Sequence, residues 1–118
     1  MIGIGIDLCD VARIEKAIRD DHFLRRVFTQ AEREYIALRG AQSAAGIFAA
    51  KEAAVKALGT GFDGFFTDSV EITRDEHGCP VCVFAGRARE IFEKMGARSV
   101  LVSITHSQGM AAAVAVIE

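Results

Sequence analysis

Proline is almost absent from this chain of 118 residues, and its single occurrence, Pro80, marks no linker. Repeats and low-complexity blocks are absent too, so we expect one domain that covers residues 1–118. Because 51% of the residues are apolar and 25% are charged, the chain can bury a core, which excludes intrinsic disorder.

Long hydrophobic runs are also missing. The longest, Met110–Ile117, is far too short to span a bilayer. The first residues lack the basic segment of a secretory signal, and Asp7 interrupts their apolar run. We therefore expect no membrane association and a location in the reducing cytoplasm.

The chain has no excess of basic residues and few cysteines. The 14 Lys and Arg are balanced by 16 Asp and Glu, for a net charge of −2, whereas a general nucleic-acid binder needs a basic excess. Three cysteines do not indicate a disulfide framework. The motif Cys79-x-x-Cys82 has no second pair to complete a zinc site, so we interpret both residues as ordinary thiols.

The first half of the chain predicts one strand and three helices. Ile2–Leu8 alternates glycine with isoleucine, which is typical of a buried strand whose glycines let another backbone come close. Asp10 is the expected N-cap of the first helix. The capping box at Thr29 starts Gln30–Arg39, and the alanine-rich stretch Ala41–Leu58 is the longest predicted helix.

The second half predicts four strands and one helix. Alternating or apolar runs indicate strands, and one apolar stripe at helical spacing indicates a helix over residues 88–95. The predicted strands are Val70–Arg74, Cys79–Phe84, Ser99–Thr105 and Met110–Ile117. The order β-α-α-α-β-β-α-β-β predicts an α+β domain with a mostly antiparallel sheet and helices packed on one face.

Two carboxylates and a glycine loop are the first candidates for chemistry. Asp7 ends a Gly-Ile strand, where it is paired, metal-bound or, equally well, the cap of the next turn. Glu52 and Lys56 form an i, i+4 pair, which is usually solvated helix surface. The following Gly59-Thr60-Gly61 offers N–H groups to an anion, although the dipole at a helix C-terminus opposes this.

His106 and Ser107 are the other candidates, because they stand at a strand end beside a turn, where side chains project to solvent or into a cleft. An isolated histidine there is also typical of a plain turn. Together with Asp7, Glu52 and two lysines, these residue types are compatible with Mg²⁺-assisted phosphate chemistry.

Three blocks of sequence carry a family resemblance that covers essentially the whole chain. They are Gly3-Ile4-Gly5-Ile6-Asp7, Phe48-Ala49-Ala50-Lys51-Glu52-Ala53 with Lys56-Ala57-Leu58-Gly59-Thr60-Gly61, and Val102-Ser103-Ile104-Thr105-His106-Ser107. The sequence resembles the holo-[acyl-carrier-protein] synthases, which are short, bacterial-type 4′-phosphopantetheinyl transferases. Such enzymes move 4′-phosphopantetheine from coenzyme A to a serine of apo acyl carrier protein and release adenosine 3′,5′-bisphosphate.

The resemblance implies roles for individual residues. Asp7 and Glu52 would hold Mg²⁺, and Lys56 would meet the coenzyme A phosphates with Lys51 nearby. The loop Gly59, Thr60 and Gly61 would meet the same phosphates, and His106 and Ser107 would approach the 3′-phosphate. The serine would lose its proton to Glu52 or to a metal-bound water.

The resemblance also implies partners. Acyl carrier proteins are acidic, and Arg13, with Lys16, Arg25 and Arg26, would form a local basic patch, or else an ordinary wet helix face. The family is typically a homotrimer with sites between subunits, and residues 110–118 suit either an interface or a sheet interior.

Two departures and two alternatives accompany this interpretation. Ile47 stands where the family commonly has an arginine associated with the nucleotide end, and Cys79 replaces a lysine. The alternatives are a non-catalytic module that binds coenzyme A or carrier protein, and a purely structural trimer. The presence of Asp7, Glu52 and Lys56 disfavours the first, because binding alone needs no paired metal carboxylates.

Overall fold

The computed structural model of the chain describes residues 2–59 and 69–118. Its elements, in chain order, are β1 (Gly3–Asp10), α1 (Val11–Ala17), α2 (Asp21–Val27), α3 (Gln30–Arg39), α4 (Ala41–Ala57), β2 (Val70–Arg74), β3 (Pro80–Phe84), α5 (Gly86–Lys94), β4 (Val100–Ser107) and β5 (Met110–Ile117). The α+β class and the predicted order are confirmed. The short helix α2 is an addition, and it begins where the Asp20 side chain accepts a hydrogen bond from the His22 N–H.

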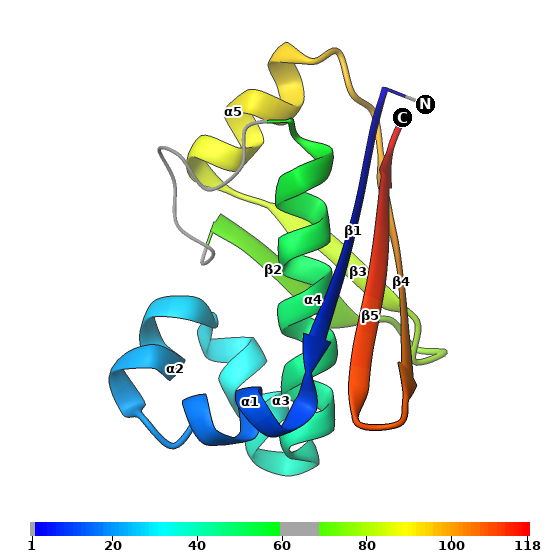
Figure 1. Cartoon of the computed structure of the whole chain (residues 1–118). Helices are drawn as coiled ribbons and strands as arrows, with labels where there is room; N and C mark the ends of the chain where they lie inside the picture. The colour runs from blue at the N-terminus through cyan, green and yellow to red at the C-terminus, as the bar shows by residue number, and fades with distance from the viewer. Residues whose placement is uncertain (1, 60–68) are drawn as a thin grey trace.

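The strands form two antiparallel sheets. A three-stranded sheet has the order β1-β5-β4, and β2 pairs with β3 in a separate hairpin. Residues 110–117 thus occupy the sheet interior, one of the two positions that their composition allowed. Figure 1 shows the helices on one side of the β1-β5-β4 sheet, with α4 along it and the hairpin crossing behind α4.

Helix α4 packs unusually close to β1, and glycine is the reason. A Cβ atom on Gly5 would overlap the carbonyl oxygen of Ala53, and one on Gly3 would overlap that of Ala57. The predicted close approach of two backbones is therefore confirmed. It brings the first half of β1 directly against the C-terminal half of α4.

Alternation along the three-stranded sheet separates a buried face from an exposed one. On β5, Ala111, Ala113, Ala115 and Ile117 are at most 3% exposed and face α4. The opposite face keeps large aliphatic side chains in solvent. These are Ile4 (59% exposed), Ile6 (68%), Leu8 (63%) and Leu101 (59%).

Local signals in the sequence also proved correct. The Thr29–Glu32 capping box is present, and Asp10 caps α1 by accepting from the Ala12 N–H. Cys82 is buried on β3, and Cys79 is exposed just before β3, which begins one residue later than predicted. Within residues 2–59 and 69–118, no helix is both long and apolar enough to cross a membrane.

Candidate active site

Asp7 and Lys56 meet at the contact between β1 and α4. The Lys56 Nζ donates to the Ile6 carbonyl oxygen at 3.0 Å and lies 3.2 Å from Asp7 Oδ1. The Asp7 side chain is 18% exposed and that of Lys56 53%. Since Asp10 caps the next helix, Asp7 does not have the capping role that was its alternative. Its partner is an accessible lysine.

Glu52 joins this pair from one helical turn earlier in α4. Its side chain is half-buried, and burial together with the negative charge of Asp7 raises the pKa of Glu52 to about 7, while Lys56 acts in the opposite direction. The effect of Asp7 indicates that the two carboxylates lie near each other. The sequence-predicted trio of Asp7, Glu52 and Lys56 is therefore assembled in one place.

The donor set of this trio suits magnesium. Among the described residues, no group of three or more His, Cys, Asp or Glu forms a ready-made metal cage. Mg²⁺ does not need one, because it is commonly bound by one or two carboxylates, several waters and substrate phosphates. Asp7 and Glu52 supply two hard oxygen ligands that repel each other, and a divalent cation would relieve that repulsion.

Lys51 is placed elsewhere. Its Nζ lies 2.5 Å from Glu32 Oε1, and both side chains are fully buried. The structure therefore puts Lys51 in the core beside Glu32, while the neighbouring Glu52 is influenced by the charge of Asp7. It does not bring Lys51 to the exposed group that the resemblance suggested.

His106 and Ser107 lie at the exposed end of β4, on the opposite edge of the sheet from β1. The His106 Nε2 is 2.8 Å from the Gln42 carbonyl oxygen in the first turn of α4. Two strand spacings, about 10 Å, separate β4 from β1. Within one chain, these two residues are thus not part of the Asp7 trio.

The predicted glycine loop is only partly visible. Gly59 follows the end of α4 with a φ of +81°, which is typical of glycine just after a helix. Thr60 and Gly61 lie outside the described residues. The Lys56 side chain reaches the surface one turn before this point, as the phosphate-binding interpretation requires.

Arg13 is exposed on α1, and its charge is felt by the Cys9 thiol on β1. It lines a small cavity of about 130 Å³ with mostly apolar neighbours. The other lining residues are Cys9, Ile14, Ala17, Phe23 and Phe48. Of the other predicted basic residues, Arg25 is paired with Asp21 at 2.8 Å, while Lys16 and Arg26 are exposed like Arg13.

Ile47 is 1% exposed and belongs to the core. The departure from the family's usual arginine therefore adds an apolar side chain to the packing of α4.

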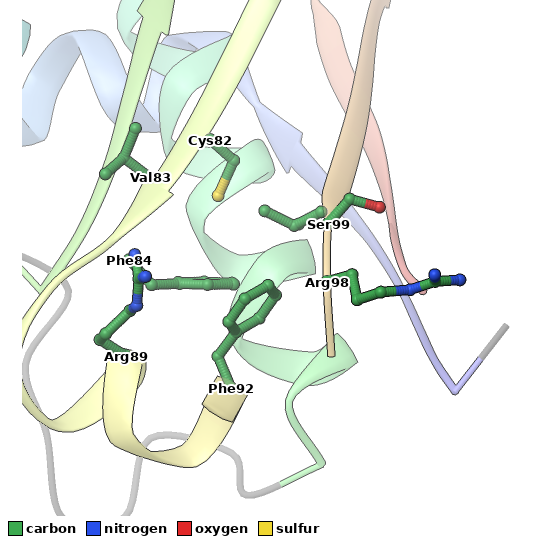
Figure 2. Close-up of a pocket in the computed structure, with 8 residues that line it drawn as sticks. Cys82, Val83, Phe84, Arg89, Phe92, Arg98 and Ser99 are labelled. Carbon is green, nitrogen blue, oxygen red and sulfur yellow. The ribbon is translucent and has the colours of Figure 1, made fainter. Parts of the chain in front are cut away.

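A larger cavity of about 340 Å³ lies between β3, α5 and the start of β4 (Figure 2). Phe84 and Phe92 form its apolar wall, with ring centroids 5.3 Å apart, and the Arg98 side chain extends away from them. Burial raises the pKa of the Cys82 thiol there to about 12, so it is not a ready nucleophile. None of the predicted site residues lines this cavity.

Backbone groups are what sequence reasoning missed. The carbonyl oxygens of Ile6 and Gln42 hold Lys56 and His106, respectively. A pattern of side chains does not predict which backbone carbonyl will accept a hydrogen bond, because every residue has one. Gly46 is also part of this second contact and was read only as part of an alanine-rich helix.

Comparison with known proteins agrees with the geometry. Residues 3–115 match the model of the 4′-phosphopantetheinyl transferase superfamily. The chain is 43% identical over 120 residues to the holo-[acyl-carrier-protein] synthase of Caldicellulosiruptor saccharolyticus, covering 100% of this chain and 97% of that protein.

Solved structures give the same answer. The crystal structure of the Helicobacter pylori holo-[acyl-carrier-protein] synthase in complex with coenzyme A is similar, with a TM-score of 0.86, 31% identity, and coverage of 98% of this chain and 99% of that one. The synthase from Neisseria meningitidis has a TM-score of 0.88 and 31% identity, with coverage of 100% and 99%. This chain belongs to the 4′-phosphopantetheinyl transferase superfamily and is an enzyme of the holo-[acyl-carrier-protein] synthase group.

Proposed function

We propose that the chain transfers 4′-phosphopantetheine from coenzyme A to a serine hydroxyl of apo acyl carrier protein, with Mg²⁺, and releases adenosine 3′,5′-bisphosphate. The observation that carries this proposal is the meeting of Asp7, Glu52 and Lys56 at one accessible point. Similar synthases bear this activity in their names, and one was solved with coenzyme A bound.

The reaction forms a bond from the serine oxygen to the β-phosphorus of coenzyme A and breaks the bond from that phosphorus to the bridging oxygen. Lys56 meets the diphosphate, because its Nζ stands at the surface and offsets charge that grows on the leaving group. Bound between Asp7 and Glu52, Mg²⁺ would supply further charge neutralisation of the diphosphate.

Glu52 is suited to two tasks. Its carboxylate is a metal ligand by chemistry, and in the metal-free protein a pKa of about 7 suits a group that accepts a proton at neutral pH. The other candidate for the base is a metal-bound water. Either assignment makes the carboxylate of Glu52 necessary for turnover.

Mass spectrometry tests this function directly. Apo acyl carrier protein incubated with the enzyme, coenzyme A and Mg²⁺ should gain the mass of phosphopantetheine, with an equal amount of adenosine 3′,5′-bisphosphate formed. Binding of coenzyme A without any mass gain would instead support the non-catalytic binding module. No ligand-dependent change in melting temperature would support a structural trimer only.

The enzyme functions as a homotrimer in the cytoplasm under this proposal. The exposed aliphatic face of Ile4, Ile6, Leu8 and Leu101 supports self-association, because contiguous apolar patches are typical of interfaces. Asp7 and His106 stand on opposite edge strands, so we infer that a neighbouring copy brings a second His106 toward each Asp7.

Subunit mixing tests the shared site. Glu52→Gln should be nearly inactive alone and His106→Ala should be less active with coenzyme A, and an unfolded and refolded mixture should regain part of the activity. Ile6→Asp should convert the trimer to monomer in analytical ultracentrifugation. A monomeric but fully active wild-type protein would contradict the shared site.

Arg13 serves carrier-protein recognition in this proposal. Arg13→Glu should slow association with the acidic carrier protein and weaken its salt dependence, while coenzyme A binding is unchanged. An association rate with unaltered salt dependence would exclude this role.

A further inference from the structure

His106 is held against the start of α4 by a contact that specifies its protonation pattern. Its Nε2 lies 2.8 Å from the Gln42 carbonyl oxygen. A carbonyl oxygen only accepts hydrogen bonds, so the ring must donate from Nε2. The neutral ring is then the Nε2–H tautomer, and Nδ1 is the nitrogen left to meet a ligand.

Gly46 makes this contact possible. A Cβ atom at position 46 would lie 3.1 Å from His106 Nε2, 3.2 Å from His106 Cε1 and 3.0 Å from Ile104 Cγ2. These distances are shorter than most Cβ contacts, so an alanine at position 46 would require its neighbours to move by a few tenths of an ångström. Because His106 is an exposed side chain at a strand end, it is the group that would yield.

Glycine costs about 1 kcal/mol relative to alanine inside a helix. Gly46 nevertheless lies well inside α4, in a stretch where alanine is otherwise common. The closeness of the His106 ring explains why glycine is present here despite this cost.

We propose that Gly46 and the Gln42 carbonyl are positioning groups that hold His106 as the Nε2–H tautomer and direct Nδ1 toward the 3′-phosphate of coenzyme A. This inference rests on the proposed function, in which His106 approaches that phosphate. When the phosphate binds, Nδ1 takes up a proton from solvent, and the resulting imidazolium donates from Nδ1 to a phosphate oxygen while Nε2 still donates to the Gln42 carbonyl oxygen. Gly46 thereby acts on substrate selection without touching the substrate.

The first test is nuclear magnetic resonance of the imidazole nitrogens in the wild-type trimer without ligand. Only three histidines are present, and His106→Ala identifies the relevant signals. At a pH where the ring is neutral, we expect a protonated Nε2 and an unprotonated Nδ1. A dominant Nδ1–H tautomer would overturn the inference and leave the proposed transferase function intact.

The second test is kinetic and compares coenzyme A with 3′-dephospho-coenzyme A. A hydrogen bond to a charged group is worth about 1.5–3 kcal/mol, so wild type should prefer coenzyme A by about 10- to 150-fold. Gly46→Ala should reduce this preference at least 5-fold by raising KM for coenzyme A. Its kcat and its KM for the dephospho substrate should stay near wild type, and its melting temperature should not fall.

Matched variants separate the possible failures. Ser43→Ala, in the same part of α4, should keep the preference, whereas His106→Ala should lose it. If His106→Ala loses the preference and Gly46→Ala keeps it with an unchanged tautomer, the positioning role is refuted and the proposed function stands. If wild type transfers phosphopantetheine without any preference, the 3′-phosphate role of His106 fails, and with it this inference.

Discussion

Helix α4 makes two lysine–carboxylate pairs that have the same chemistry and opposite surroundings. The pair of Lys51 with Glu32 is fully buried, with Nζ and Oε1 at 2.5 Å. The pair of Lys56 with Asp7 is longer, at 3.2 Å, and half of the lysine side chain is exposed. The two pairs differ in accessibility: of these two lysines, Lys56 can contact an anion from solvent and Lys51 cannot.

The buried pair joins separate parts of the fold. Glu32 accepts hydrogen bonds from the Thr29 and Ile72 N–H groups as well as from Lys51, and so connects α3, α4 and β2. Burial raises the pKa of the Glu32 carboxyl, and Lys51 with the two N–H donors opposes that rise. Removing one partner of such a buried pair is strongly destabilising, because the other charge is left in the core without compensation.

The exposed pair leaves its lysine ready to change partners. An ion pair in solvent is worth about 0–1 kcal/mol, so Lys56 loses little when it turns from Asp7 to a phosphate. The same residue types therefore stabilise the fold at one position of α4 and perform chemistry at another. Depth of burial decides between the two.

Breaking the buried pair should have the largest effect. Lys51→Met leaves the Glu32 carboxylate in the core without its ammonium partner, which should lower the free energy of unfolding by about 3–5 kcal/mol. Urea denaturation measures this loss. The double variant Glu32→Gln with Lys51→Met should recover most of it, and a single variant as stable as wild type would show that the pair is not structural.

Breaking the exposed pair should have a smaller effect, on activity alone. Lys56→Met should change the free energy of unfolding by no more than about 1 kcal/mol, while kcat falls about 100-fold or more. Lys94→Met, at the equivalent last turn of α5, is the control and should keep full activity. A Lys56→Met enzyme with normal kcat would remove Lys56 from the reaction.

A separate effect concerns the pH dependence of the metal-free protein. Because the pKa of Glu52 rises from about 4.5 unfolded to about 7 folded, the folded state holds the proton more tightly. The contribution of Glu52 to stability is therefore complete below pH 4.5 and is lost as the pH rises through 7. Glu52→Gln should flatten this part of the stability curve, and the exposed control Glu15→Gln should not. Identical curves for Glu52→Gln and wild type would contradict the raised pKa.

Much of the fold followed from local patterns. The Gly-Ile repeat predicted a close approach that the Gly5–Ala53 contact confirms, and the Thr29 capping box defined the start of α3. The helix α2 was missed, because its seven residues are too few for a clear apolar period and only Asp20 marks its start. The division of the strands into two sheets also had no local signal.

The residues of the candidate site could be predicted from the sequence, but their depth of burial could not. Asp7 was notable as a carboxylate in an apolar strand, and Glu52 and Lys56 as an i, i+4 pair, so all three were named before their meeting was known. The sequence does not distinguish Lys51 from Lys56, because both are lysines on the same predicted helix. Their different depths depend on which face of α4 meets Glu32 and which meets β1.

The sequence by itself determined the α+β class, the strand and helix order, the family and the residues with chemistry to offer, because these depend on short-range periodicity and residue type. Only the tertiary structure decided that Lys51 is buried while Lys56 is exposed, and that His106 leans on a backbone carbonyl above Gly46. Burial and backbone contacts depend on how distant segments pack against each other, and local sequence patterns do not specify that packing.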